Sequence, residues 1–159
     1  MGKSKDMIGI KGMFRIHITN PDGTLAGDSG WHSNVVVDQG YRYFLCALLG
    51  KTTGSSQVGY VALGSGGEPA PSTTALPSEL AEAVRKAVAA VTSSTSKAVR
   101  FTATFGSSDA FITGAAKDIS NIGLYATNTG SNLFAGNTYN SSSCASNQQV
   151  NVSYDISFT

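Results

Sequence analysis

The chain has 159 residues, a length that suits one domain with a core of its own. Only 13% of the residues are charged and the formal net charge is +1, which excludes the clustered basic face of a nucleic-acid-binding protein. The longest apolar run, 44–49, is far shorter than the ~20 residues that span a bilayer, and no apolar signal stretch opens the sequence. We therefore expect neither a nucleic-acid nor a membrane partner, and a surface of hydroxyls and amides that faces other protein.

The first predicted strand begins near Gly12 and ends at Thr19, where apolar residues alternate with polar ones. The sequence Asn-Pro-Asp-Gly at 20–23 predicts a turn, and a second strand near 24–26 would complete a hairpin. Residues 1–12 are expected to form an arm that contacts a neighbouring subunit, ahead of a single domain at 13–159. The residues proposed for this contact are Lys3, Lys5, Ile8, Ile10 and Lys11.

Two helices are predicted. Asp38 can cap a helix over 38–49, in which Tyr41, Phe44, Leu45, Leu48 and Leu49 have helical spacing and Gly50 marks the end. Strong helix formers after Ser78 predict a second helix over 78–91. The alternative is that only the first turn there is helical and that the chain becomes a strand from Val84 onward.

The remaining apolar segments predict strands. They lie at 58–63, around 99–105, at 119–125, from 133 onward, and at 150–158 after a polar loop at 141–149. The regular alternation at 150–158 predicts a strand that is paired inside a sheet. The predicted fold is mainly β, an antiparallel β-sandwich or barrel-like sheet with one or two α-helices packed on it. The expected core residues are Phe14, Ile16, Trp31, Phe44, Leu48, Val61, Phe101, Leu124 and Tyr154, and Gly64 and Gly123 are expected to hold tight backbone geometry.

No constellation of residues predicts catalysis, a cofactor site or a metal site. The two histidines, His17 and His32, lack metal-binding spacing, the ten acidic residues are dispersed, and no Gly-x-Ser-x-Gly motif occurs. We therefore expect a protein that is not an enzyme. Cys46 is expected to be buried and Cys144 to lie in a Ser-rich loop; a disulfide between them is the less favoured alternative.

Five segments form a pattern along nearly the whole chain. They are Met-Phe-Arg-Ile-His-Ile at 13–18, Trp-His-Ser-Asn-Val-Val-Val-Asp-Gln-Gly at 31–40, Tyr-Val-Ala-Leu-Gly-Ser-Gly at 60–66, Ile-Ser-Asn-Ile-Gly-Leu-Tyr at 119–125, and the alternating stretch 150–158. Their order and spacing resemble the short virion structural proteins of tailed bacteriophages, which are related in pattern to tail-collar fibre proteins. The third segment is followed by Pro69, Pro71, Leu76 and Glu79, similar to the proline, leucine and glutamate positions of that family.

The resemblance implies a virion building block without catalytic residues. Arg85 stands near the arginine that the family has after its third segment, whereas Asn121 replaces the usual glutamate of the fourth. An ion pair between that glutamate and Arg85 is therefore not carried over. Glu79, Arg85 and Asn121 are expected to be ion-pairing or structural residues.

The expected function is self-assembly and docking to other virion proteins, in a virion assembled in the host cytoplasm. A tail-associated place (tube, collar or fibre attachment) is favoured, and capsid decoration or cement is the alternative. An open sheet edge, such as the last strand, would be covered by the next subunit. The alternative from another class is a carbohydrate-binding β-sandwich module that uses Trp31, Tyr125 and Tyr139.

Overall fold

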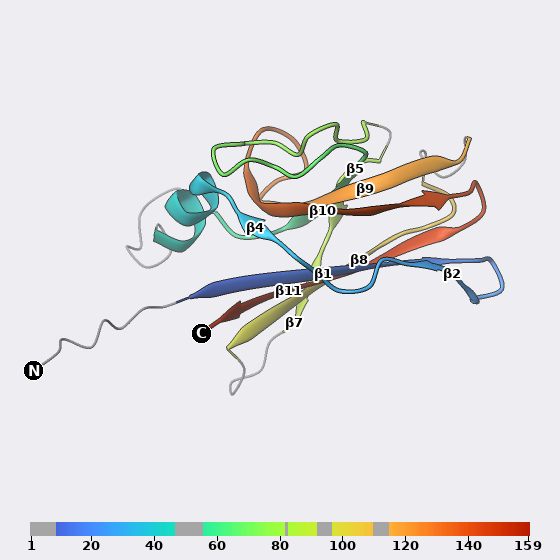
Figure 1. Cartoon of the computed structure of the whole chain (residues 1–159), viewed down its shortest axis with the longest axis horizontal. Helices are drawn as coiled ribbons and strands as arrows, with labels where there is room; N and C mark the ends of the chain where they lie inside the picture. Colours follow the sequence, from blue (N-terminus) through green and yellow to red (C-terminus); the bar gives the residue numbers. More distant parts are fainter. Residues whose placement is uncertain (1–8, 47–55, 82, 92–96, 110–114) are drawn as a thin grey trace, which may run out of the picture.

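The structure is a computed structural model that describes residues 9–46, 56–81, 83–91, 97–109 and 115–159. Two antiparallel sheets lie over each other as the layers of a sandwich (Figure 1). The first sheet has the order β2–β1–β11–β8–β7, with β3 also paired to β1, and the second has the order β4–β10–β9–β5–β6. The expectation of a mainly β fold is therefore confirmed.

The strands of the first sheet are β1 (Ile10–Thr19), β2 (Leu25–Asp28), β3 (His32–Ser33), β7 (Ala89–Val91), β8 (Ala98–Phe105) and β11 (Gln149–Phe158). Those of the second sheet are β4 (Val35–Val36), β5 (Tyr60–Gly64), β6 (Lys86–Ala87), β9 (Lys117–Tyr125) and β10 (Leu133–Cys144). The polar loop expected at 141–149 is thus shorter than predicted, because β10 continues to Cys144.

The core lies between the sheets, where the alternating residues of both layers meet. Of the expected core residues, those that are buried are Phe14, Ile16, Phe44, Val61, Phe101, Leu124 and Tyr154. Leu48 lies outside the described residues. Trp31 was wrongly expected in the core, since it is 40% exposed. His32 stacks on buried Phe14 and so points inward, which turns its neighbour Trp31 to the outer face of the sheet.

The first predicted helix is wound differently from the expectation. Asp38 and Gln39 form a helical turn, and Gly40–Cys46 form a π-helix, η1, in place of the predicted α-helix. Phe44 of η1 packs on Phe134 of β10 with ring centroids 5.0 Å apart, while Tyr41 is exposed. Packing against β10 decides which side chains η1 buries, and this tertiary contact overrides the α-helical spacing.

The described residues of 78–91 do not form the second predicted helix. Ser78 has a φ of 48°, Glu79 forms a β-bridge with Gly64, and the chain then becomes β6 and β7. The alternative, one helical turn followed by a strand from Val84, is closer to the structure. The strand begins at Lys86, however, and the first turn is not helical. The backbone of this segment bonds to its sheet neighbours, for example from Leu80 N to Leu63 O at 3.0 Å, so pairing replaces helical bonds.

The segment that contains β6 and β7 joins the two sheets along one side of the sandwich. Ala87 pairs with Tyr60 in the second sheet, and Ala90, three residues later, pairs with Phe101 in the first. The last strand, β11, lies between β1 and β8 (Figure 1). It is therefore a central strand, which confirms the prediction that 150–158 pairs inside a sheet and rules out the last strand as an example of a covered open edge.

Gly64 and Gly123, where the sequence predicted tight backbone geometry, each lie close against a neighbouring side chain. A Cβ on Gly64 would lie 2.2 Å from Oδ1 of Asn121, and a Cβ on Gly123 would lie 2.7 Å from Cδ1 of Leu133. Both glycines therefore allow β5 and β9 to approach their neighbours more closely than an alanine would.

Candidate assembly surfaces

β7 is an open edge of the first sheet. Its three residues, Ala89, Ala90 and Val91, are exposed and uncharged, and the Val91 side chain is 62% exposed. In the part of the chain that the structure describes, β8 pairs with one side of β7 and no strand pairs with the other. Unpaired backbone groups at such an edge are a template for a further strand.

The N-terminal arm residues fall in two places. Ile10 and Lys11 lie in β1, opposite Phe158 and Ser157 of β11, so the strand begins within the range expected for the arm. Lys3, Lys5 and Ile8 lie outside the described residues. Gly9 continues the pairing by exchanging two backbone hydrogen bonds of 2.8 Å with Thr159.

The outer face of the first sheet carries Trp31 among charged pairs. The guanidinium of Arg100 lies 5.5 Å from the Trp31 ring centroid and donates two hydrogen bonds of 2.7 Å to Asp155. Nearby, Arg15 pairs with Asp28. The hydrogen bonds from Arg15 hold the pKa of the Asp28 carboxyl well below its usual range. Both ion pairs are partly exposed to solvent. They hold the side chains of this face in place but contribute little to the free energy of unfolding.

Glu79 and Arg85, which the sequence singled out, form a bidentate ion pair. Arg85 donates to Glu79 through Nε at 2.7 Å and Nη2 at 2.9 Å, and to the carbonyls of Thr127 and Gly130 at 3.1 and 3.0 Å. The Arg85 side chain is 8% exposed and its guanidinium lies 3.4 Å over the Tyr125 ring. The pair therefore joins the stretch just before β6 to the turn at 126–131.

Tyr125 lies under the Arg85 guanidinium and hydrogen-bonds to Glu79. Its hydroxyl donates to Oε2 of Glu79 at 2.9 Å and accepts the backbone N–H of Leu76 at 2.6 Å. Burial raises the pKa of this phenol, so it remains a neutral donor. The sequence did not predict that Tyr125 joins Glu79 and Arg85. The only signal for it was its position at the end of the apolar segment 119–125.

Asn121 does not join the ion pair and instead holds the loop before Glu79. It is fully buried, and its Nδ2 donates to the carbonyls of Gly67 at 3.0 Å and Pro77 at 2.8 Å. An ionised glutamate has no donor for these carbonyls. The Asn121 amide, which donates, therefore matches the carbonyl acceptors that surround it.

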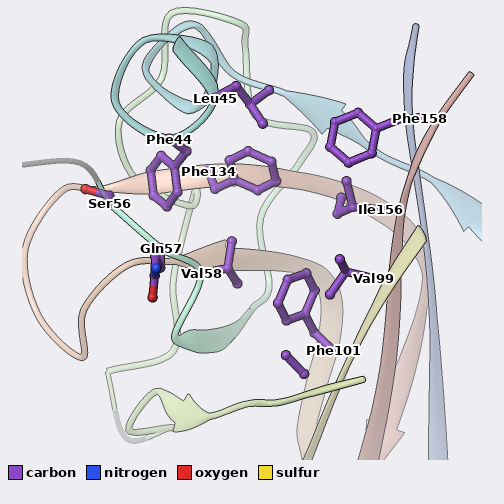
Figure 2. Close-up of a pocket in the computed structure, with 11 residues that line it drawn as sticks. Phe44, Leu45, Ser56, Gln57, Val58, Val99, Phe101, Phe134, Ile156 and Phe158 are labelled. Atoms are coloured by element: carbon purple, nitrogen blue, oxygen red, sulfur yellow. The ribbon is translucent and has the colours of Figure 1, made fainter. Parts of the chain in front are cut away.

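An apolar pocket of about 370 Å³ lies between the sheets, lined by residues of η1 and of the end of β11. Figure 2 shows Phe44, Leu45 and Phe134 on one side and Val99, Ile156 and Phe158 on the other. Further lining residues are Ser56, Gln57, Val58, Ala90 and Phe101. No residue of this lining carries a charge, so the pocket suits an apolar occupant.

Among the described residues, no three His, Cys, Asp or Glu side chains gather where they could hold a metal ion. His17 lies 3.4 Å from Asp28, and His32 Nε2 lies 2.7 Å from the Ser29 carbonyl. Cys144 is a free, buried thiol at the end of β10, and burial raises its pKa.

Two of the three aromatic residues proposed for carbohydrate binding are unsuited to it. Tyr125 and Tyr139 are buried, and only Trp31 offers an exposed ring. In the described ranges, no helix has the length and apolar character needed to cross a bilayer. No protein-family model matches the chain, and no curated protein matches it either.

Proposed function

We propose that this chain is a structural protein of a bacteriophage virion that acts by self-assembly and by docking to other virion proteins. The observation that carries the proposal is the open edge at β7. Monomeric β-proteins commonly protect such an edge with charge, proline or a covering segment. β7 instead presents Ala89, Ala90 and the 62% exposed Val91.

The composition supports the same conclusion. Only 13% of the residues are charged, and charged residues are the ones that protein interfaces avoid. The bacteriophage class rests on the resemblance of the five sequence segments. Within that class we favour a tail-associated place in a tube, collar or fibre attachment, with capsid decoration as the alternative.

The assembly state of the purified chain tests this proposal. Negative-stain imaging and sedimentation velocity should show rings, tubes or regular oligomers for a tail component. A small oligomer that binds capsids would favour decoration. A chain that stays monomeric at every concentration and binds neither virion part would contradict the proposal.

A matched pair of variants tests the role of the edge. Val91→Lys adds a charge to β7 and should raise the concentration needed for regular assembly at least about tenfold, because an edge lysine must be desolvated on pairing. Asn128→Lys adds the same charge to an exposed turn away from the edge and should leave assembly unchanged. If both variants assembled at the same concentration, β7 would have no role in assembly.

A carbohydrate-binding module is the second candidate, favoured by one observation. Trp31 is 40% exposed on a sheet face beside Arg100 and Asp155, a setting in which a sugar ring could stack on the indole. Glycan-array binding that is lost in Trp31→Ala, by a chain that remains monomeric, would favour this candidate over virion assembly.

A further inference from the structure

The apolar pocket between the sheets has walls that the fold itself holds in place. Phe101 in β8 and Ile156 in β11 belong to the first sheet, in which these two strands pair with each other. Phe134 in β10 belongs to the second sheet and packs on Phe44 of η1 with ring centroids 5.0 Å apart. All four side chains are buried. The pocket is therefore largely pre-formed, as sites for small molecules usually are.

The size and lining of the pocket suit hydrocarbon better than water. Its volume is about 370 Å³, and an apolar cavity of about 150 Å³ holds one benzene molecule. An ordered water needs about two to four polar partners, whereas the lining side chains other than those of Ser56 and Gln57 are hydrocarbon. An apolar occupant would remove this surface from water, which is favourable.

The polar side chains of the lining lie together on one side of the pocket. Ser56 and Gln57 are adjacent residues ahead of β5, and Figure 2 shows them opposite Phe158, Ile156 and Val99. The hydroxyl and the amide can hydrogen-bond to an uncharged polar group. Because no residue of the lining carries a charge, a carboxylate or an ammonium group would lose its hydration there without gaining a partner.

We propose that the pocket binds an uncharged amphiphile of about ten to fifteen carbon atoms, a size scaled from benzene in its cavity. The hydrocarbon body lies between the sheets, and the one polar end, a hydroxyl or an amide, lies at Ser56 and Gln57. A fatty alcohol and a neutral single-chain lipid share this chemistry. The site goes beyond the proposed function, because its lining comes from one copy of the chain and it needs no assembly.

Titration of the full-length chain with 1-decanol and with decanoate tests the chemistry of the site. 1-Decanol should bind to a single saturable site, measured by isothermal titration calorimetry, and should raise the melting temperature as its concentration increases. Decanoate should bind at least about tenfold more weakly at pH 7, because its charge meets no cation in the lining.

Variants that fill the pocket test its location. Val58→Phe and Val99→Phe each add a ring to the lining and should lower the affinity for 1-decanol at least about tenfold, because the protein then occupies the space. Val84→Phe is the matched control and should bind like the unaltered chain, since Val84 is 67% exposed and does not line this pocket. Circular dichroism shows whether each variant keeps its fold.

The polar end of the site has a test of its own. Gln57→Leu keeps the apolar lining and removes the amide, so it should bind 1-decanol at least about threefold more weakly. Nuclear Overhauser contacts between the decanol chain and the rings of Phe44 and Phe134 should appear in the unaltered chain at saturation. These contacts locate the ligand without any substitution.

Several results would overturn the proposal. They are the lack of saturable binding by the unaltered chain, the lack of contacts to the phenylalanine rings, and undiminished binding by a folded Val58→Phe or Val99→Phe. Decanoate that binds as tightly as 1-decanol, or full affinity in Gln57→Leu, would overturn the uncharged polar end. Sedimentation velocity of the same samples records assembly separately, so failure of this site and failure of the proposed function are distinguishable.

Discussion

Two arginines with similar partners show how burial determines what a side chain contributes to stability. Arg85 and Arg100 each form a bidentate pair with a carboxylate and lie near an aromatic ring. The Arg85 side chain is 8% exposed, whereas that of Arg100 is 51% exposed. Water screens the second pair and cannot replace the donors of the first.

We therefore expect Arg85→Met to lower the free energy of unfolding by about 2–3 kcal/mol, because Glu79 and two carbonyls lose their donors. Arg100→Met should lower it by less than about 1 kcal/mol. Urea denaturation of both variants measures the difference. Equal losses would mean that the pair formed by Arg85 and Glu79 is not the structural contact described above.

At the scale of elements, η1 depends on a close backbone contact at its first residue. A Cβ on Gly40 would lie 2.2 Å from the carbonyl oxygen of Phe134 in β10. A side chain there would move η1 away from the sheet, and with it Phe44, which packs on Phe134 and lines the apolar pocket. The helix position is thus set by a contact distant in sequence.

Gly40→Ala should cost about 1–3 kcal/mol of stability, because the added methyl group meets backbone that cannot move without disturbing β10. Gly67→Ala is the matched control, since nothing lies within 4 Å of the Cβ it would add. Its effect should be near zero or slightly stabilising, through a less flexible unfolded chain. Thermal denaturation compares the two, and an equally stable Gly40→Ala would contradict the contact.

At the scale of the whole molecule, three buried phenols link stability to pH. Burial raises the pKa values of Tyr125, Tyr139 and Tyr154 above the ordinary value of 10.0. In the unfolded chain these groups lose their protons near pH 10, while the folded chain retains them. The stabilising contribution is complete below that pH and is lost as the pH rises through the raised pKa values.

The free energy of unfolding should therefore fall above about pH 10, with a slope that approaches about 4 kcal/mol per pH unit for three protons. Denaturant titrations at increasing pH, followed by tyrosinate absorbance, measure this slope. Tyr154→Phe should reduce it by about one third. A slope unaffected by that substitution would show that Tyr154 ionises equally in both states.

Strand alternation was the part of the fold that the sequence predicted well, and the helices were the part that it predicted poorly. Phe14 and Ile16 in β1 and Tyr154 in β11 lie inward as their alternation indicates. The segment 78–91 has helix-forming residues, yet its backbone pairs with β5 and β8. Local propensity is a weak force there, because tertiary hydrogen bonds satisfy the same backbone groups.

The sequence by itself determined the β-rich class and the positions of the long strands, because both depend on local period. Glu79 and Arg85 were singled out by the resemblance of the sequence segments and not by local period. Only the tertiary structure decided that Trp31 faces outward, that Tyr125 bonds to the ion pair, which strands flank β11, and that β7 is an open edge. These features depend on which strands become neighbours, and contacts between residues far apart in the chain are not encoded in any single window of sequence.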